Sequence, residues 1–209
     1  VIRRSQVVTG SKNDTAHLDN EFRFSFVEAD ITDASLVSRW DKIDEIYNLA
    51  SPASPVDFTL RPIFILQTAS LGQTNMLEIA KKTNARVLFA STSEVYGDPL
   101  QHPQVESYWG NVNPIGIRGC YDEAKRFGEA ITMAYHRYHS VNTRIARIFN
   151  TYGSRMRPED GRVIPNFFSQ AVKKESLTIY GDGSQTRSLC YVSDLVAGLY
   201  ALMQSECTE

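Results

Sequence analysis

The sequence has few cysteines and lacks the spacings typical of disulfide frameworks or zinc sites. Its three cysteines, Cys120, Cys190 and Cys207, are an odd number at wide intervals, with no CxxC pair. We therefore expect reduced thiols in an intracellular compartment and no bound metal. The histidines show no metal-ligand spacing either. We assign these conspicuous side chains to packing or to the surface: His17, His102, Trp109, His136, His139 and Met156.

Long apolar runs and an excess of one charge are also absent. No stretch of about 18 apolar residues occurs, and the N-terminus carries no secretory hydrophobic region. We expect no membrane segment in this chain and a cytoplasmic protein, with an upstream anchor in a longer product left open. The 22 basic and 24 acidic residues give a net charge of −2, which gives no reason to expect a nucleic-acid partner. With 209 residues, 42% of them hydrophobic, the chain has the composition of a globular protein of one domain or slightly more.

A glycine-rich phosphate-binding loop is missing too. Dinucleotide-binding sheets place such a loop after the first strand, where the backbone approaches a pyrophosphate at a helix N-terminus. Here Gly10 is followed by no glycine until Gly72, and the GxxG of Gly116 and Gly119 follows a proline-bearing loop. The sequence therefore shows no recognisable first βα unit of that kind.

What the chain does contain is a tyrosine and a lysine, four residues apart, at the start of a helical pattern. Apolar residues recur at helical spacing over residues 121–140, so Tyr121 and Lys125 share a helix face. Gly128 and Thr132 lie on that face in place of bulky groups, which lets a strand edge or a flat ligand approach closely. A phenol has an ordinary pKa of about 10, and a neighbouring ammonium favours the phenolate, as acid–base catalysis requires. The alternative is a surface tyrosine beside a solvated lysine.

A cluster of hydroxyls and a carboxylate follows a short apolar segment. Residues 86–90 have the pattern of a buried strand, and Ser91, Thr92, Ser93 and Glu94 come directly after it. Catalytic groups in open α/β sheets gather at the carboxyl ends of the strands, so this cluster is a candidate site. The alternative is that the hydroxyls only cap the next helix. Capping accounts for one hydroxyl and leaves the carboxylate unexplained.

Strand-like and helix-like segments alternate along the chain. We expect strands at residues 24–29, 44–49, 86–90 and 143–149. We expect helices at residues 33–40, 61–82, 121–140, 165–174 and 193–204. This alternation favours an α/β fold with a doubly wound parallel sheet.

Several longer blocks of sequence are typical of one family. They are NLASPASPV at 48–56, ASTSEVYGDP at 90–99, YWGNVNPIG at 108–116, CYDEAKR at 120–126, ARIFNTYG at 146–153 and YGDGSQTRS at 180–188. Together they resemble the UDP-glucuronic acid decarboxylase (UDP-xylose synthase) family of the extended short-chain dehydrogenase/reductase superfamily. The resemblance runs from about Asp30 to about Met203.

The resemblance implies a Rossmann-like doubly wound parallel sheet that lacks the first βα unit and carries part of a small C-terminal substrate domain. Residues 1–152 would form the NAD-binding domain, and residues 153–209 a partial nucleotide-sugar-binding region interleaved with it. The family's glycine-rich fingerprint precedes the segment that resembles residues 7–12, and a further C-terminal portion follows, so the chain is expected to be an internal fragment. Helices resembling residues 61–82 and 121–140 form a dimer bundle in the superfamily, which implies a homodimer when full length.

Site residues are implied by the same resemblance. Those expected to contact NAD are Asp30, Ile31, Leu49, Ala50, Ser51, Thr68, Tyr121 and Lys125. Those expected to contact a UDP-sugar are Asn150, Val163, Tyr180 and Arg187, and those expected in catalysis are Thr92, Ser93, Glu94, Tyr121 and Lys125. Without the resemblance, Asp30 and Asn150 are turn residues, Leu49 and Ala50 are core, and Arg187 is a loop arginine. The sequence departs from the family at two positions. Ser5 or Gln6 stands where the family has an acidic residue that holds the adenosine ribose, and Ala69 stands where an Asn is common.

The implied reaction is NAD-dependent decarboxylation of UDP-glucuronate to UDP-xylose. Tyr121 would remove the proton of the sugar 4-hydroxyl as C4 is oxidised, with Thr92 bonded to the same oxygen. The resulting 4-ketone makes loss of the C6 carboxylate easy, and the reduced cofactor would then restore the alcohol. Another nucleotide-sugar 4,6-dehydratase or 4-epimerase is the alternative enzyme, and a catalytically silent fragment is the alternative without activity.

Overall fold

The computed structural model describes residues 2–3, 24–158 and 160–206. Parallel strands pair there in three small sheets, in the orders β1-β2, β3-β4-β5 and β6-β7. The strands are β1 (Ile2–Arg3), β2 (Val27–Glu28), β3 (Glu45–Asn48), β4 (Arg86–Thr92), β5 (Thr143–Ile148), β6 (Asn150–Tyr152) and β7 (Leu189–Tyr191). The helices are α1 (Leu36–Arg39), α2 (Pro55–Leu60), α3 (Pro62–Gln67), η2 (Thr68–Gly72), α4 (Gln73–Thr83), η3 (Ser93–Tyr96), α5 (Gly119–His139), α6 (Val163–Lys173) and α7 (Val192–Gln204).

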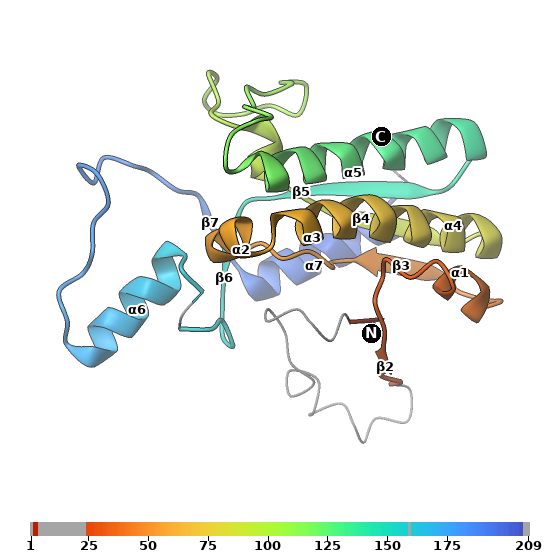
Figure 1. Ribbon diagram of the computed structural model, residues 1–209, viewed down its shortest axis with the longest axis horizontal. Helices are drawn as coiled ribbons and strands as arrows, with labels where there is room; N and C mark the ends of the chain where they lie inside the picture. Colours follow the sequence, from red (N-terminus) through yellow and green to blue (C-terminus); the bar gives the residue numbers. More distant parts are fainter. Residues whose placement is uncertain (1, 4–23, 159, 207–209) are drawn as a thin grey trace.

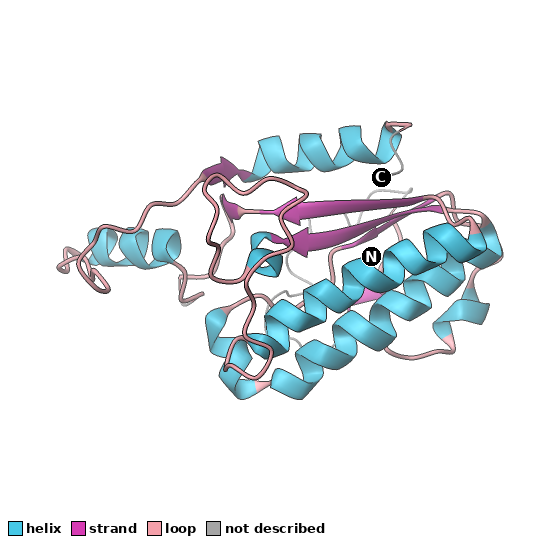
Figure 2. Cartoon of the chain, turned by 90° about the horizontal axis from the view of Figure 1, so that it is seen from above, coloured by secondary structure: helices cyan, strands magenta, loops and turns pink. Residues whose placement is uncertain are grey.

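The central sheet, formed by β3, β4 and β5, lies between two helical layers. Helices α3, α4 and α5 cover one face and α7 covers the other, while α6 stands apart at one end (Figures 1 and 2). On the first face Leu77 of α4 packs with Val87 of β4. On the second face Leu199 and Met203 of α7 pack with Leu88. Successive side chains of a strand point to opposite faces, so β4 is buried on both sides. This explains its continuous apolar run and confirms the expected Rossmann-like α/β class.

Helix α5 packs tightly against strand β4 at Gly128. A Cβ atom built on Gly128 would lie 2.2 Å from the Phe89 ring. Thr132, one turn later, is fully buried and its Oγ1 accepts a hydrogen bond from Gln73 Nε2 at 2.8 Å. Asn48 Nδ2 of β3 donates in turn to Gln73 Oε1 at 2.6 Å. The small residues on this helix face therefore leave room for the Phe89 side chain and for a buried series of hydrogen bonds from Asn48 through Gln73 to Thr132.

Strands β4 and β6 are among those that differ from the sequence prediction. Strand β4 does not end at residue 90 but continues through Thr92, because Ser91 and Thr92 stay in register with Arg147 and Ile148 of β5. Asn150, which by itself suggested a turn, instead begins strand β6, so the turn interpretation is wrong. Its backbone pairs with Leu189, which is distant in sequence, and local sequence does not reveal such pairing.

Two helical predictions also change. The helix expected at residues 61–82 contains the π-helical turn η2 and is preceded by the unpredicted α2. Helix α2 has a clear start, since Ser54 Oγ accepts a hydrogen bond from Val56 N at 3.3 Å and Pro55 occupies the first turn. The strand expected at residues 24–29 is limited to β2, and the helix expected at 33–40 to α1. Predictions that fall outside the described residues concern Ser5, Gln6, residues 7–12, His17 and Cys207.

The contact at Gly128 gives a stability prediction. In Gly128→Ala the new methyl group overlaps the buried Phe89 ring, and such overpacking costs about 1–3 kcal/mol. Gly198→Ala in α7 is the matched control, because a Cβ atom there meets nothing within 4 Å. Better helix propensity should stabilise that variant by up to about 1 kcal/mol. Urea unfolding of both variants measures the difference, and equal effects at the two positions would reject the close-contact explanation.

Candidate active site at the carboxyl ends of the central strands

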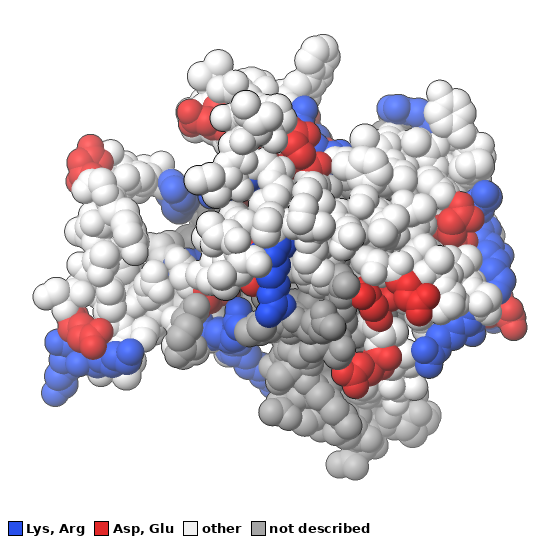
Figure 3. All heavy atoms as spheres, viewed as in Figure 1, with Lys and Arg blue, Asp and Glu red and all other residues white. Residues whose placement is uncertain are grey.

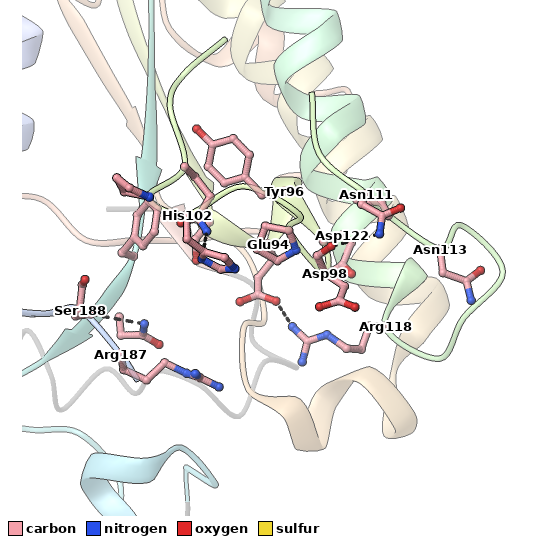
Figure 4. Close-up of a pocket in the computed structure, with 18 of the residues that line it drawn as sticks. Glu94, Tyr96, Asp98, His102, Asn111, Asn113, Arg118, Asp122, Arg187 and Ser188 are labelled. Carbon is pink, nitrogen blue, oxygen red and sulfur yellow. Dashed lines mark hydrogen bonds and ion pairs between the residues drawn. The ribbon is translucent and has the colours of Figure 1, made fainter. Parts of the chain in front are cut away.

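Two adjoining cavities open beside the carboxyl ends of β4 and β5. Their volumes are about 600 Å³ and about 1090 Å³. Both are lined by Ser93, Glu94, Arg118, Phe149, Asn150 and Arg187. Cavities of this size accommodate small-molecule ligands, and open parallel sheets bind them at this edge. Figure 4 shows polar side chains converging on the larger cavity.

Tyr121 lies in the wall of the smaller cavity. Only 6% of its surface is exposed, and its ring stacks on Phe58 with centroids 4.8 Å apart. Burial raises the pKa of Tyr121, while a hydrogen bond with Thr92 and the positive charges of Arg162 and Arg118 lower it. Burial is the larger effect, so this environment stabilises the protonated phenol. The phenol is thus held next to a hydroxyl and two guanidinium groups.

Lys125 is buried beside Tyr121, on the same face of α5, as the four-residue spacing predicted. Its Nζ donates a hydrogen bond to Ala90 O at 2.7 Å and lies 5.8 Å from the centroid of the Tyr121 ring. It also lies 5.1 Å from the Phe89 ring, close enough for a cation–π contact. Burial lowers the pKa of Lys125 to about 8. The ammonium is thus desolvated and held at the end of β4.

The hydroxyls at the carboxyl end of β4 and in the turn that follows have separate roles. Thr92 Oγ1 accepts a hydrogen bond from Glu94 N at 3.3 Å and so caps η3, as the capping alternative supposed. Ser91 instead donates to Glu129 Oε1 at 2.5 Å and faces away from the cavities. Ser93 lines both cavities. Capping therefore explains one hydroxyl and leaves Ser93 available to a ligand.

Glu94 forms an ion pair with Arg118, which precedes the first turn of α5. The side chains are 35% and 53% exposed, and Figure 4 shows them pointing toward one another in the cavity. Arg187 extends toward the same part of the cavity from the segment before β7 (Figure 4). Positive and negative groups thus meet where the two cavities join.

A second arginine–glutamate pair lies behind η3. Arg147 of β5 donates to Glu129 of α5 from Nε at 2.9 Å and from Nη2 at 2.8 Å. Its Nη1 also donates to Tyr96 OH and to Glu106 O, each at 2.9 Å. With Ser91 bonded to the same carboxylate, this network ties β4, β5, α5 and η3 together. It fixes the position of the turn that carries Ser93 and Glu94.

The structure brings most of the expected residues to the smaller cavity. Those that line it are Leu49, Ser51, Thr92, Ser93, Glu94, Tyr121, Lys125, Asn150, Val163 and Arg187. The remaining candidates, which line neither cavity, are Asp30, Ile31, Ala50, Thr68 and Tyr180.

Local contacts are seen for several of the residues outside the cavities. Asp30 Oδ1 accepts hydrogen bonds from Thr32 N at 3.0 Å and Thr32 Oγ1 at 2.9 Å, as in a turn. Ile31 is core, Thr68 Oγ1 donates to Phe64 O at 2.8 Å, and the Tyr180 side chain is largely exposed.

Sequence reasoning missed several cavity residues. Arg118, Phe58 and Arg162 line the smaller cavity, and Met156, which was assigned to packing or surface, lines it as well. His102 lines the larger one. Only Arg118 had a signal in the sequence. It lies three residues before Tyr121, and this spacing places it about one helical turn away. The others reach the site through loops and α2.

Some features are not seen in the part of the chain that the structure describes. No helix there is long and apolar enough to cross a membrane. Within the same residues, no three His, Cys, Asp or Glu side chains gather to hold a metal ion. Cys120 and Cys190 are free thiols. Figure 3 shows acidic and basic side chains interspersed among larger uncharged areas of one face.

Comparisons with known proteins agree with this geometry. A parallel sheet with a Tyr–Lys pair at its edge defines a Rossmann-like enzyme class, and residues 2–208 match the model of the NAD dependent epimerase/dehydratase family. The chain therefore belongs to that family. It is 56% identical over 198 residues to UDP-glucuronic acid decarboxylase 4 of Arabidopsis thaliana, covering 95% of this chain and 44% of that protein. The chain thus spans about half the length of this curated relative.

Two solved structures are also similar. UDP-N-acetylglucosamine 4-epimerase from Methanobrevibacter ruminantium M1, in complex with UDP-N-acetylmuramic acid, has a TM-score of 0.88 and 26% identity, over 100% of this chain and 66% of that one. A variant of UDP-glucuronic acid 4-epimerase from Bacillus cereus, in complex with a fluorinated UDP-glucuronic acid analogue and NAD, has a TM-score of 0.80 and 26% identity. It covers 94% of this chain and 60% of that one.

The buried Lys125 predicts a pH-dependent stability. Its pKa is lowered from 10.5 to about 8, so between these values the unfolded chain binds a proton that the folded chain does not, and stability rises with pH. The free energy of unfolding of the parent, relative to Lys125→Met, should increase by about 2 kcal/mol from pH 8 to pH 10. Lys42→Met, at an exposed position, is the control. A pH-independent difference for Lys125→Met would contradict the burial of a titrating ammonium.

The network behind η3 predicts a second stability effect. Glu129→Gln leaves the Arg147 guanidinium without its counter-charge, and the loss should be about 2–4 kcal/mol. The matched control is Asp41→Asn, because the Asp41 side chain is 98% exposed beside Lys82. Exposed pairs contribute about 0–1 kcal/mol. Chemical unfolding compares the two variants, and similar small losses would show that the network does not hold η3.

Proposed function

We propose that this chain carries the catalytic part of a UDP-glucuronate decarboxylase that forms UDP-xylose with NAD. The observation that carries the proposal is the meeting of Tyr121, Thr92 and Glu94 in one cavity at the end of β4. The 56% identity to a decarboxylase supports it, because that relative's name states the same reaction class. The B. cereus structure supports the cofactor and a uronic acid ligand.

The residues at the sheet edge fit a nicotinamide cofactor. Among the described residues Lys125 Nζ makes one hydrogen bond, to a backbone carbonyl, which leaves two of its N–H groups for a ligand. Leu49 and Ser51, which follow β3, line the same cavity. A bound NAD would supply reversible hydride transfer to and from the sugar. Lys125 and Tyr121 would hold the nicotinamide ribose in this proposal. The other proposed cofactor contacts are Asp30, Ile31, Leu49, Ala50, Ser51 and Thr68.

The chain's own groups account for the proton transfers. Tyr121 acts as the phenolate, the form that the positive charges of Arg118 and Arg162 favour against the effect of burial, and it becomes the neutral phenol when it takes the proton of the sugar 4-hydroxyl. Thr92, bonded to Tyr121, aligns the same oxygen. Once C4 is a ketone, the C5–C6 bond breaks and its electron pair moves onto the C4 oxygen as carbon dioxide leaves. Tyr121 and Thr92 stabilise this enolate by hydrogen bonds. Ser93 and Glu94 orient the ring and help return a proton to C5.

The nucleotide end of the substrate would lie toward β6 and α6. Arg187 and Asn150 line both cavities and are suited to the diphosphate, because a guanidinium binds phosphate oxygens in a bidentate manner. Val163 lines the smaller cavity. Tyr180, proposed to lie near the uridine, is 75% exposed here and would have to approach the ligand.

Assembly and domain division are further parts of the proposal. We assign residues 1–152 to the NAD-binding domain and residues 153–209 to a partial nucleotide-sugar-binding region. Ile63 and Leu66 on α3 and Phe127 on α5 are apolar and exposed, which supports a homodimer through these helices. We also propose a cytoplasmic location, which the free thiols of Cys120 and Cys190 support. The structural similarity to epimerases keeps a 4-epimerase as the second candidate.

The decisive assay supplies UDP-glucuronate and catalytic NAD to the longest protein that this reading frame encodes. We expect carbon dioxide and UDP-pentose, with kcat about 10²–10⁴-fold lower in Tyr121→Phe because the acid–base group is lost. Tyr200→Phe, at an exposed position on α7, is the control and should keep the parent's rate. A UDP-hexuronate product without carbon dioxide would identify a 4-epimerase instead, and no turnover with bound NAD would reject both.

A further inference from the structure

Arg118 occupies the junction of the two cavities. It precedes the first turn of α5, three residues before Tyr121, and it lines both cavities. Its guanidinium pairs with Glu94 and lies 5.6 Å from the centroid of Phe58, the ring on which Tyr121 stacks. A cation therefore lines the same cavity as the proposed proton acceptor, and Figure 4 shows it turned toward Glu94.

The two arginine–glutamate pairs of this site differ in how readily a ligand could replace a partner. The side chains of Arg147 and Glu129 are 27% and 15% exposed, and further bonds to Tyr96 and Glu106 hold the arginine in place. Arg118 and Glu94 are 53% and 35% exposed. An exposed ion pair contributes about 0–1 kcal/mol, so another carboxylate can displace Glu94 at little cost. The first pair is structural, and the second is exchangeable.

We infer that Arg118 binds the carboxylate of the UDP-hexuronate substrate and exchanges Glu94 for it. The inference rests on the proposed function and names the residue that selects an acidic sugar. Tyr121 acts at C4, and the carboxylate is attached to the neighbouring ring carbon C5, so the group that binds it must lie near Tyr121, and Arg118 lines the same cavity. A guanidinium accepts a carboxylate through two parallel hydrogen bonds, which a neutral hydroxymethyl group does not reproduce.

The exchange also suits the later steps of the reaction. Glu94, released from Arg118, can accept a hydrogen bond from a ring hydroxyl. When carbon dioxide leaves, the negative charge passes to the C4 oxygen and Arg118 loses its ligand carboxylate. The Arg118–Glu94 pair then re-forms, which offsets the lost contact. Arg118 is thereby never left without a counter-charge.

Titration calorimetry with UDP-glucuronate, UDP-glucose and UDP tests the inference in the longest protein of this reading frame. Arg118→Gln should lower the affinity for UDP-glucuronate about tenfold or more, the equivalent of about 1.4 kcal/mol or above. It should leave the affinities for UDP-glucose and UDP nearly unchanged. Arg118→Lys should recover part of the affinity. Arg187→Gln is the matched control, because loss of a diphosphate contact weakens all three ligands alike.

Glu94→Gln provides the opposite test, since it removes the competing carboxylate while keeping Arg118. It should bind UDP-glucuronate at least as tightly as the parent. The inference fails if Glu94→Gln weakens the binding of UDP-glucuronate as much as Arg118→Gln does. It also fails if Arg118→Gln weakens the binding of UDP-glucuronate and UDP-glucose equally, or the binding of neither. If the parent itself binds UDP-glucose as well as UDP-glucuronate, the proposed function falls together with the inference. If both the parent and Arg118→Gln bind UDP-glucuronate more tightly than UDP-glucose, the inference alone is overturned.

Discussion

The contact between β4 and α5 is the constraint on which the rest of the site depends. Gly128 leaves room for the Phe89 ring, so the helix lies directly against the central strand. This close packing brings Lys125 Nζ to 2.7 Å from the backbone oxygen of Ala90, near the carboxyl end of β4. Since Tyr121 is one turn earlier on the same helix, its phenol is placed over the end of the strand. A bulkier residue at position 128 would move the helix and with it both catalytic candidates.

The charged groups around this contact divide into fixed and exchangeable pairs. Behind η3 the Arg147–Glu129 pair is partly buried and joined to Ser91, so it holds the turn in position. In front of η3, Arg118 and Glu94 meet in the open part of the cavity. The difference is one of solvent exposure and number of partners, because both pairs have the same chemistry. Rigidity behind the site and exchange within it are complementary requirements for positioning a ligand.

Periodic features of the sequence predicted the parts of the site that lie on regular elements. The four-residue spacing predicted that Tyr121 and Lys125 share a face, and the apolar run predicted that Thr92 to Glu94 lie at a strand end. Residues joined through distant pairing were not predictable in this way. Asn150 belongs to a strand only because Leu189 is its partner, and Arg162, in a loop before α6, lines the same cavity as Tyr121. Burial likewise raises the pKa of Tyr121, whereas the sequence analysis expected the neighbouring ammonium to favour the phenolate.

The sequence by itself determined the α/β class, the family blocks and the identities of the reactive groups, because helical and strand periodicities and short motifs are local properties of the chain. Tertiary structure alone decided that Ser91 faces Glu129, that Glu94 pairs with Arg118 and that Lys125 is desolvated. Each of these depends on distances between segments that are far apart in the sequence. Electrostatic energies vary steeply with distance and burial, and local sequence encodes neither quantity.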